Sequence, residues 1–254
     1  MTTNFPLLLL AFFVAFVLVA DLFRRYRAIA LAFFTLSLPS LLAPNSDLFM
    51  RIKTASVLLP TCFLVYARFK PRIERFIHRL IYAVIVLNIV EASVIDIKTG
   101  NYLNLIAAIA LMLALPFSQK HWEISGRYND YVVHLPSFWP LLYTSWNLCF
   151  LYSARISTFG YALPLLLAPL AYALVLRRTD LYFQARAYTF GFYLFFRAAF
   201  GDAELMNLPQ FDLSAWYSSE FALAWSAANA AFAGALVYIH SSNRKRISTV
   251  THRN

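Results

Sequence analysis

Long apolar runs, separated by short polar segments, extend from one end of the chain to the other. A helix that crosses a membrane needs about 20 mainly apolar residues, within a usable range of about 17–25. Nine runs lie near this length, although several are short. The pattern predicts an all-α bundle of nine transmembrane helices that forms one membrane domain over residues 1–254. The predicted spans are 6–23, 28–44, 54–69, 80–96, 102–118, 137–154, 157–176, 183–200 and 220–240.

The composition points to the same class of protein. Hydrophobic residues make up 61% of the chain and charged residues 13%, with a mean hydropathy of +0.60. Soluble domains contain about 45–50% apolar and about 25% charged residues. We therefore expect the lipid bilayer to be the main partner, and the cell (inner) membrane to be the location. The first apolar run follows no basic residue, so we expect a retained helix and not a cleaved signal peptide.

The net charge of +10 raises the question of nucleic-acid binding, which the positions of the basic residues argue against. Basic residues gather in the cytoplasmic loops of membrane proteins. With the N-terminus outside and the C-terminus cytoplasmic, 17 of the 22 Lys and Arg residues lie inside. These are Arg24, Arg25, Arg27, Arg68, Lys70, Arg72, Arg75, Arg79, Lys120, Arg127, Arg177, Arg178, Arg186, Arg244, Lys245, Arg246 and Arg253. The two longest loops are then 119–136 inside and 201–219 outside.

The fourth span contains the ionisable residue that most needs an explanation. Charged side chains cost about 2.5–3.5 kcal/mol at the centre of a membrane helix on insertion scales. Asn88 and Glu91 are three residues apart and share one helix face. Asp96 is rotated by about 140° from Glu91 at about 100° per residue, so we expect it to serve the membrane interface. Glu91 is a candidate ligand-binding group, or it accepts a hydrogen bond from Asn88 within the helix.

The sixth and eighth spans carry further candidate binding residues. Arg197 lies at a depth similar to that of Glu91, so the two could form an ion pair, either functional or architectural. In the sixth span, Tyr143 and Asn147 are four residues apart and lie on one face. Buried Asn in membrane helices commonly joins helices, which is the alternative to ligand contact. The full set of candidates is Asn88, Glu91, Tyr143, Trp146, Asn147, Gln184, Arg186 and Arg197.

Three sequence motifs resemble an uncharacterised bacterial multi-pass membrane family that is catalogued only as a domain of unknown function. The likeness covers roughly residues 80–200. Its motifs are Asn88-x-x-Glu91-Ala92 with Asp96, Tyr143-x-x-Trp146-Asn147, and Gln184-x-Arg186-Ala187-x-Thr189.

The resemblance implies that the polar residues of these motifs belong to one common arrangement. It indicates no reaction and no substrate. Arg197 is not part of the family pattern. The resemblance therefore raises Arg186 as an alternative partner for Glu91.

Signatures of known enzymes are mostly absent from the sequence. It contains no HExxH, GxSxG, P-loop or GxGxxG motif, and its histidines and its two cysteines, Cys62 and Cys149, form no metal-ligand pattern. We therefore expect no metal and no cofactor. The leading hypothesis is a transporter of a small solute or ion. The alternatives are an intramembrane enzyme acting on a lipid or isoprenoid, and a structural or accessory subunit.

Overall fold

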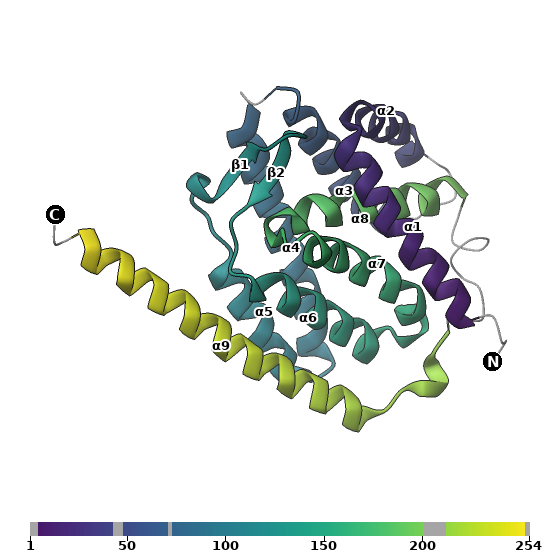
Figure 1. Ribbon diagram of the computed structural model, residues 1–254. Helices are drawn as coiled ribbons and strands as arrows, with labels where there is room; N and C mark the ends of the chain where they lie inside the picture. Colours follow the sequence, from purple (N-terminus) through teal and green to yellow (C-terminus); the bar gives the residue numbers. More distant parts are fainter. Residues whose placement is uncertain (1–4, 43–47, 71–72, 201–211, 252–254) are drawn as a thin grey trace.

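The computed structural model describes residues 5–42, 48–70, 73–200 and 212–251. Within these ranges the chain forms nine α-helices, joined mostly by short turns (Figure 1). The helices are α1 (Phe5–Arg25), α2 (Arg27–Ser37), α3 (Leu48–Ala67), α4 (Glu74–Lys98), α5 (Tyr102–Ala114), α6 (Phe138–Ala154), α7 (Ile156–Val175), α8 (Tyr182–Phe200) and α9 (Ser219–Thr251). The predicted helical fold class is confirmed.

The helices differ in their ability to cross a membrane. Four segments are long and apolar enough by length and composition, namely α1, α4, α7 and Ser219–Tyr238 of α9. In contrast, α2 has 11 residues and α5 has 13. At about 1.5 Å per residue these two helices measure about 17 and 20 Å, whereas a hydrocarbon core is about 30 Å thick. The predicted spans 28–44 and 102–118 therefore exceed the α-helices found there, although a 3₁₀ turn, η1 (Leu38–Leu42), extends the first.

Apolar side chains cover both the inside and the outside of the bundle. Phe23, Phe34 and Tyr188 join α1, α2 and α8 in a buried aromatic cluster, with ring centroids 5.2–6.0 Å apart. On the outside, large apolar residues such as Leu10 of α1 and Leu87 of α4 are exposed. Extensive exposed apolar surface of this kind is typical of helices that face lipid.

A small antiparallel sheet lies in the segment 119–136, where the sequence analysis predicted only a loop. Its strands are β1 (Trp122–Ser125) and β2 (Asp130–Val133), with Ser125 opposite Asp130. Gly126 and Asn129 have positive φ angles of 78° and 51°, and both residue types tolerate this conformation in tight turns. The all-α prediction missed this hairpin because its strands are only four residues long. Strand β2 is buried at all four positions, so it shows no alternation of buried and exposed residues, whereas Glu123 of β1 is exposed.

Helix α9 runs along α5 and α6 and its C-terminal end projects beyond the rest of the bundle (Figure 1). Its 33 residues correspond to a length of about 50 Å. The predicted last span, 220–240, therefore covers only part of a longer helix. Most of the predicted external loop 201–219 lies outside the described residues.

Candidate functional site

A cavity of about 280 Å³ lies between α3, α4, α6, α7 and α8. For comparison, a dry protein cavity of about 150 Å³ holds one benzene molecule. By the same proportion, this central cavity has room for roughly a dozen non-hydrogen atoms. Six of the eight candidate residues from the sequence line it: Asn88, Glu91, Tyr143, Asn147, Arg186 and Arg197.

The cavity has two chemically different ends. Because adjacent helices run in opposite directions, the start of one helix lies near the end of the next. Its rim contains Lys53 near the start of α3, Glu91 two turns before the end of α4, Arg155 between α6 and α7, and Arg197 in the last turn of α8.

The inner end of the cavity lies toward the opposite ends of the same helices. Leu64, Ile81, Tyr143, Phe183 and Arg186 line it. Arg197 lies eleven positions after Arg186, which corresponds to about 16 Å along α8. The cavity is therefore elongated, with a charged rim and an aromatic inner end.

At the rim, Glu91 forms an ion pair with Lys53. The Lys53 Nζ atom donates to Glu91 Oε1 at 2.8 Å, and the two side chains are 27% and 37% exposed. From the sequence, Arg197 or Arg186 was the predicted partner of Glu91. Lys53 was not a predicted partner because the apolar run begins at residue 54, whereas α3 itself begins at Leu48.

Asn88 and Glu91 line the same cavity, as their three-residue spacing predicted. No hydrogen bond joins the two side chains in the described structure, where Glu91 accepts one from Lys53 instead, so the predicted alternative of an Asn88–Glu91 hydrogen bond within the helix is not found. The Asn147 side chain has a local partner, since its Nδ2 atom donates to the Tyr143 carbonyl at 2.9 Å. Asn88 and Asn147 therefore place amide groups on the cavity wall from two different helices.

Arg186 is held at the inner end by aromatic rings. The carbon atom at the centre of its guanidinium group lies 4.8 Å from the Tyr143 ring centroid and 5.7 Å from that of Phe190. Arg186 takes part in none of the ion pairs formed between described residues. Cation–π contacts stabilise its charge without neutralising it.

Trp146 lies outside the cavity, contrary to the prediction. Its side chain is buried against Tyr143, with ring centroids 5.8 Å apart. Its carbonyl oxygen accepts a hydrogen bond from Asn104 Nδ2 at 3.4 Å. Consecutive helical residues point about 100° apart, so Trp146 and its neighbour Asn147 face different helices.

Gln184 also lies elsewhere, where it attaches the β-hairpin to α8. Its Oε1 atom accepts a hydrogen bond from the Tyr131 backbone, and its Nε2 atom donates to Asp130 Oδ1 at 3.1 Å. Burial of the Tyr131 hydroxyl raises the pKa of this phenol, so the tyrosine stays neutral. Gln184 thus contacts the hairpin and does not line the cavity, contrary to the prediction.

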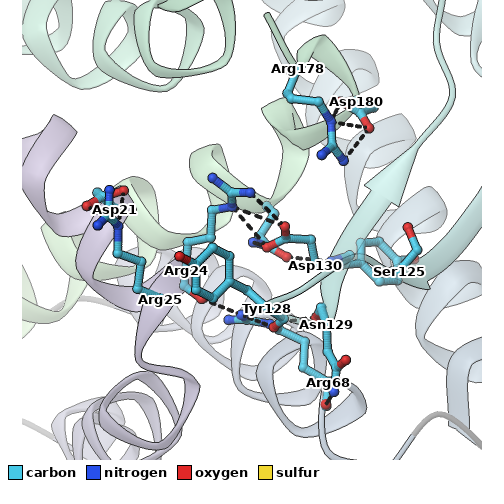
Figure 2. Close-up of polar contacts among 12 residues, drawn as sticks. Asp21, Arg24, Arg25, Arg68, Ser125, Tyr128, Asn129, Asp130, Arg178 and Asp180 are labelled. Atoms are coloured by element: carbon cyan, nitrogen blue, oxygen red, sulfur yellow. Dashed lines mark hydrogen bonds and ion pairs between the residues drawn. The ribbon is translucent and has the colours of Figure 1, made fainter. Parts of the chain in front are cut away.

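Basic residues at the end of α1 and just after α3 contact the same hairpin (Figure 2). Arg24 pairs with Asp130 at 2.9 Å. Arg68 is fully buried, and its guanidinium donates to the carbonyl oxygens of Phe23, Arg24, Tyr128 and Asn129 and to the Tyr188 hydroxyl. In the sequence, these arginines fit the expected excess of basic residues in cytoplasmic loops, and no pattern indicates their specific partners.

A second buried polar cluster joins α4, α5, α6 and α9. Asp96, which was predicted to serve the interface, is 0% exposed. Asn101 and Asn104 donate to its carboxylate at 3.2 and 3.0 Å. Asn229 then donates to Asn104 at 3.0 Å, and Ser145 donates to Asn229 at 2.7 Å. Asp96 is thus more deeply buried than Glu91. Its amide partners come from α5 and the turn before it, and a hydropathy pattern does not show which side chains of separate elements meet.

Comparison with known proteins indicates no family or function for the chain. No family model matches the chain, and no curated protein or solved structure matches it either. The resemblance to the family of unknown function therefore stays a prediction. Among the described residues, no group of three or more His, Cys, Asp or Glu side chains could hold a metal ion.

Proposed function

We propose that this chain is a multi-pass protein of the cell inner membrane that transports a small solute or ion through the central cavity. In this proposal about nine segments cross the membrane, with the N-terminus outside and the C-terminus in the cytoplasm. The observation that carries the proposal is the cavity itself, because amide and charged side chains from α3, α4, α6 and α8 converge on it. Polar groups within membrane helices are expensive and commonly mark solute or ion pathways.

The contacts of the hairpin support the proposed orientation. The end of α1 and the residue after α3 contact the hairpin through Arg24 and Arg68. The 3₁₀ turn η4 (Thr179–Leu181), which follows α7, lies against β2. These are segments in which the positive-inside rule expects cytoplasmic basic residues. The cavity rim lies at the opposite ends of α3 and α8, so it would face outward. The short helices α2 and α5 would require local thinning of the bilayer, which short helices commonly induce.

Aromatic residues close the inner end of the cavity. Trp139 stacks on Tyr143 with ring centroids 4.7 Å apart and contacts Phe183 at 5.0 Å. Trp139 is fully buried, and its indole nitrogen donates to the Leu111 carbonyl at 3.0 Å. A solute that enters from the rim would therefore reach the cytoplasm only after these rings separate. Such movement of one group of helices against another is the usual basis of alternating access.

Flux into proteoliposomes tests the proposal. The purified full chain is reconstituted, and uptake of labelled small anions, cations and neutral solutes is measured at several internal and external pH values. We expect uptake of at least one solute class above that of empty liposomes, and its loss in Arg186→Gln. Arg25→Gln is the matched control, because Arg25 lies in an exposed pair with Asp21 at the hairpin end.

Failure of every solute class in liposomes that contain folded protein would overturn the transport proposal. Conversion of a solute to a new product in the same assay would instead favour the intramembrane-enzyme alternative. Unchanged flux in Glu91→Gln, with flux intact in the parent protein, would remove Glu91 from the mechanism.

A further inference from the structure

The charges on the cavity wall are unequal in number. The described lining contains four cationic side chains, Lys53, Arg155, Arg186 and Arg197, and one carboxylate, Glu91. The carboxylate already contacts Lys53 at 2.8 Å. The rim charges are partly exposed to water, whereas Arg186 lies at the enclosed inner end, where a charge is strongly unfavourable unless an opposite charge balances it. The inner end therefore favours an anionic ligand over a cationic one.

The position of Arg186 shows where such an anion would be held. Arg186 lies at the inner end, against the faces of Tyr143 and Phe190, and it belongs to no ion pair within the described part of the chain. Arg155 is exposed at the rim, where water already screens its charge. An enclosed guanidinium therefore gains more from a bound anion than an exposed one does. Its planar group can also bind both oxygens of a carboxylate at once.

Apart from its charged and amide groups, the cavity wall is largely apolar. Val57, Leu64, Ile81, Ile85, Leu165 and Leu166 line it, and all six side chains are buried. A small, fully hydrated anion would make no apolar contact with these side chains. Ligand sites of this kind combine apolar walls with a few polar groups that fix the orientation of the ligand.

We propose that the cavity binds an amphipathic organic anion, with its carboxylate on Arg186 and its apolar body along the α3, α4 and α7 wall. The volume of about 280 Å³ limits this ligand to roughly a dozen non-hydrogen atoms. Short aryl carboxylates and medium-chain carboxylates have this size, whereas a diacyl phospholipid is several times larger. This inference deepens the proposed function, because it names the substrate class of the same cavity, but binding can be tested without transport.

Calorimetric titration of the full chain in lipid nanodiscs provides the test. The probes are cinnamate and octanoate, with cinnamyl alcohol as the neutral analogue, cinnamylammonium as the cationic analogue and acetate as the anion without an apolar body. Empty nanodiscs correct for partition into lipid. We expect both carboxylates to bind at least tenfold more tightly than cinnamyl alcohol, cinnamylammonium and acetate.

Substitutions of Arg186 locate the bound carboxylate. Arg186→Gln is expected to weaken cinnamate binding at least tenfold, and Arg186→Lys to give an intermediate value because an ammonium group lacks the planar fork. Arg25→Gln is expected to bind as the parent protein does. Thermal unfolding and size-exclusion profiles establish that each variant is folded. If Arg186→Gln does not fold, the selectivity of the parent protein and the Arg186→Lys value decide the question.

Three results would overturn the inference: equal affinity for cinnamate and cinnamyl alcohol, preferential binding of cinnamylammonium, or failure of both carboxylates to bind. Wild-type affinity in a folded Arg186→Gln would also overturn the placement of the carboxylate. Carboxylate binding without flux would contradict the transport proposal alone. Flux of a cation or of a neutral solute would contradict this inference alone.

Discussion

The Lys53 Nζ atom lies 2.8 Å from Glu91 Oε1 and joins the start of α3 to the later part of α4 at the cavity rim. Both side chains are partly exposed, so solvent screens their attraction. Exposed ion pairs stabilise proteins by about 0–1 kcal/mol. The pair therefore contributes more to the charge of the rim than to the stability of the fold.

Glu91→Gln removes the carboxylate from the rim. We expect the free energy of unfolding to fall by less than about 1 kcal/mol, and the affinity for cinnamate to rise about two- to threefold because the rim becomes more positive. Lys53→Gln is expected to change the affinity in the opposite direction. Calorimetric titration in nanodiscs measures both changes. A fall in anion affinity on Glu91→Gln would show that the carboxylate itself takes part in ligand binding.

Arg68→Gln is expected to be strongly destabilising. It removes a buried guanidinium that donates to four carbonyl oxygens from α1 and the hairpin turn. Each buried polar group left without a partner costs about 1–3 kcal/mol, so we expect a loss of about 3 kcal/mol or more. Denaturation in detergent measures the loss, and limited proteolysis at Arg127 reports release of the hairpin. The exposed control, Arg25→Gln, should stay within about 0.5 kcal/mol of the parent protein.

Gln184→Met tests whether Gln184 belongs to the hairpin or to the cavity. Methionine has a similar length and cannot form the hydrogen bonds to Tyr131 and Asp130. We expect a loss of about 1–3 kcal/mol of stability and faster proteolysis of the hairpin, with cinnamate affinity unchanged. A large loss of affinity in a folded variant would return Gln184 to the binding site.

Two helical glycines give a matched pair of alanine substitutions. A Cβ atom at Gly191 would lie 2.8 Å from Phe34 Cε1, whereas one at Gly234 would meet nothing within 4 Å. Crowding in a packed core costs about 1–3 kcal/mol, so Gly191→Ala should lower stability by about this amount. Gly234→Ala should be neutral or should stabilise α9 by up to about 1 kcal/mol, from helix propensity alone. Thermal unfolding of both variants provides the comparison, and equal effects would contradict the close contact between α8 and α2.

Helical periodicity predicted part of the candidate site. Asn88 and Glu91, like Tyr143 and Asn147, share a helix face because their spacings are three and four residues, and all four line the cavity. The same geometry explains one failure. Gln184 and Arg186 are two residues apart, so they point about 160° apart around α8. One therefore contacts the hairpin while the other faces the cavity.

Hydropathy missed the residues at the ends of the helices. Lys53 and Arg155 border apolar runs, and a pattern based on apolar residues treats such charges as the limits of a span. In the structure both line the rim. Nothing in the spacing of Arg68 or Asp96 indicates that their partners come from the hairpin turn, α1, α5 and the α4–α5 turn.

The sequence by itself determined the helical class, the approximate positions of the helices and the face on which each polar residue lies, because these depend on the local rise and rotation of the chain. Only the tertiary structure decided that Glu91 contacts Lys53, that Asp96 is buried among asparagines, and that Arg186 lies at the inner end of a cavity. Each of these relationships depends on how separate helices lie against one another. The energies that set those positions come from contacts between residues far apart in the sequence.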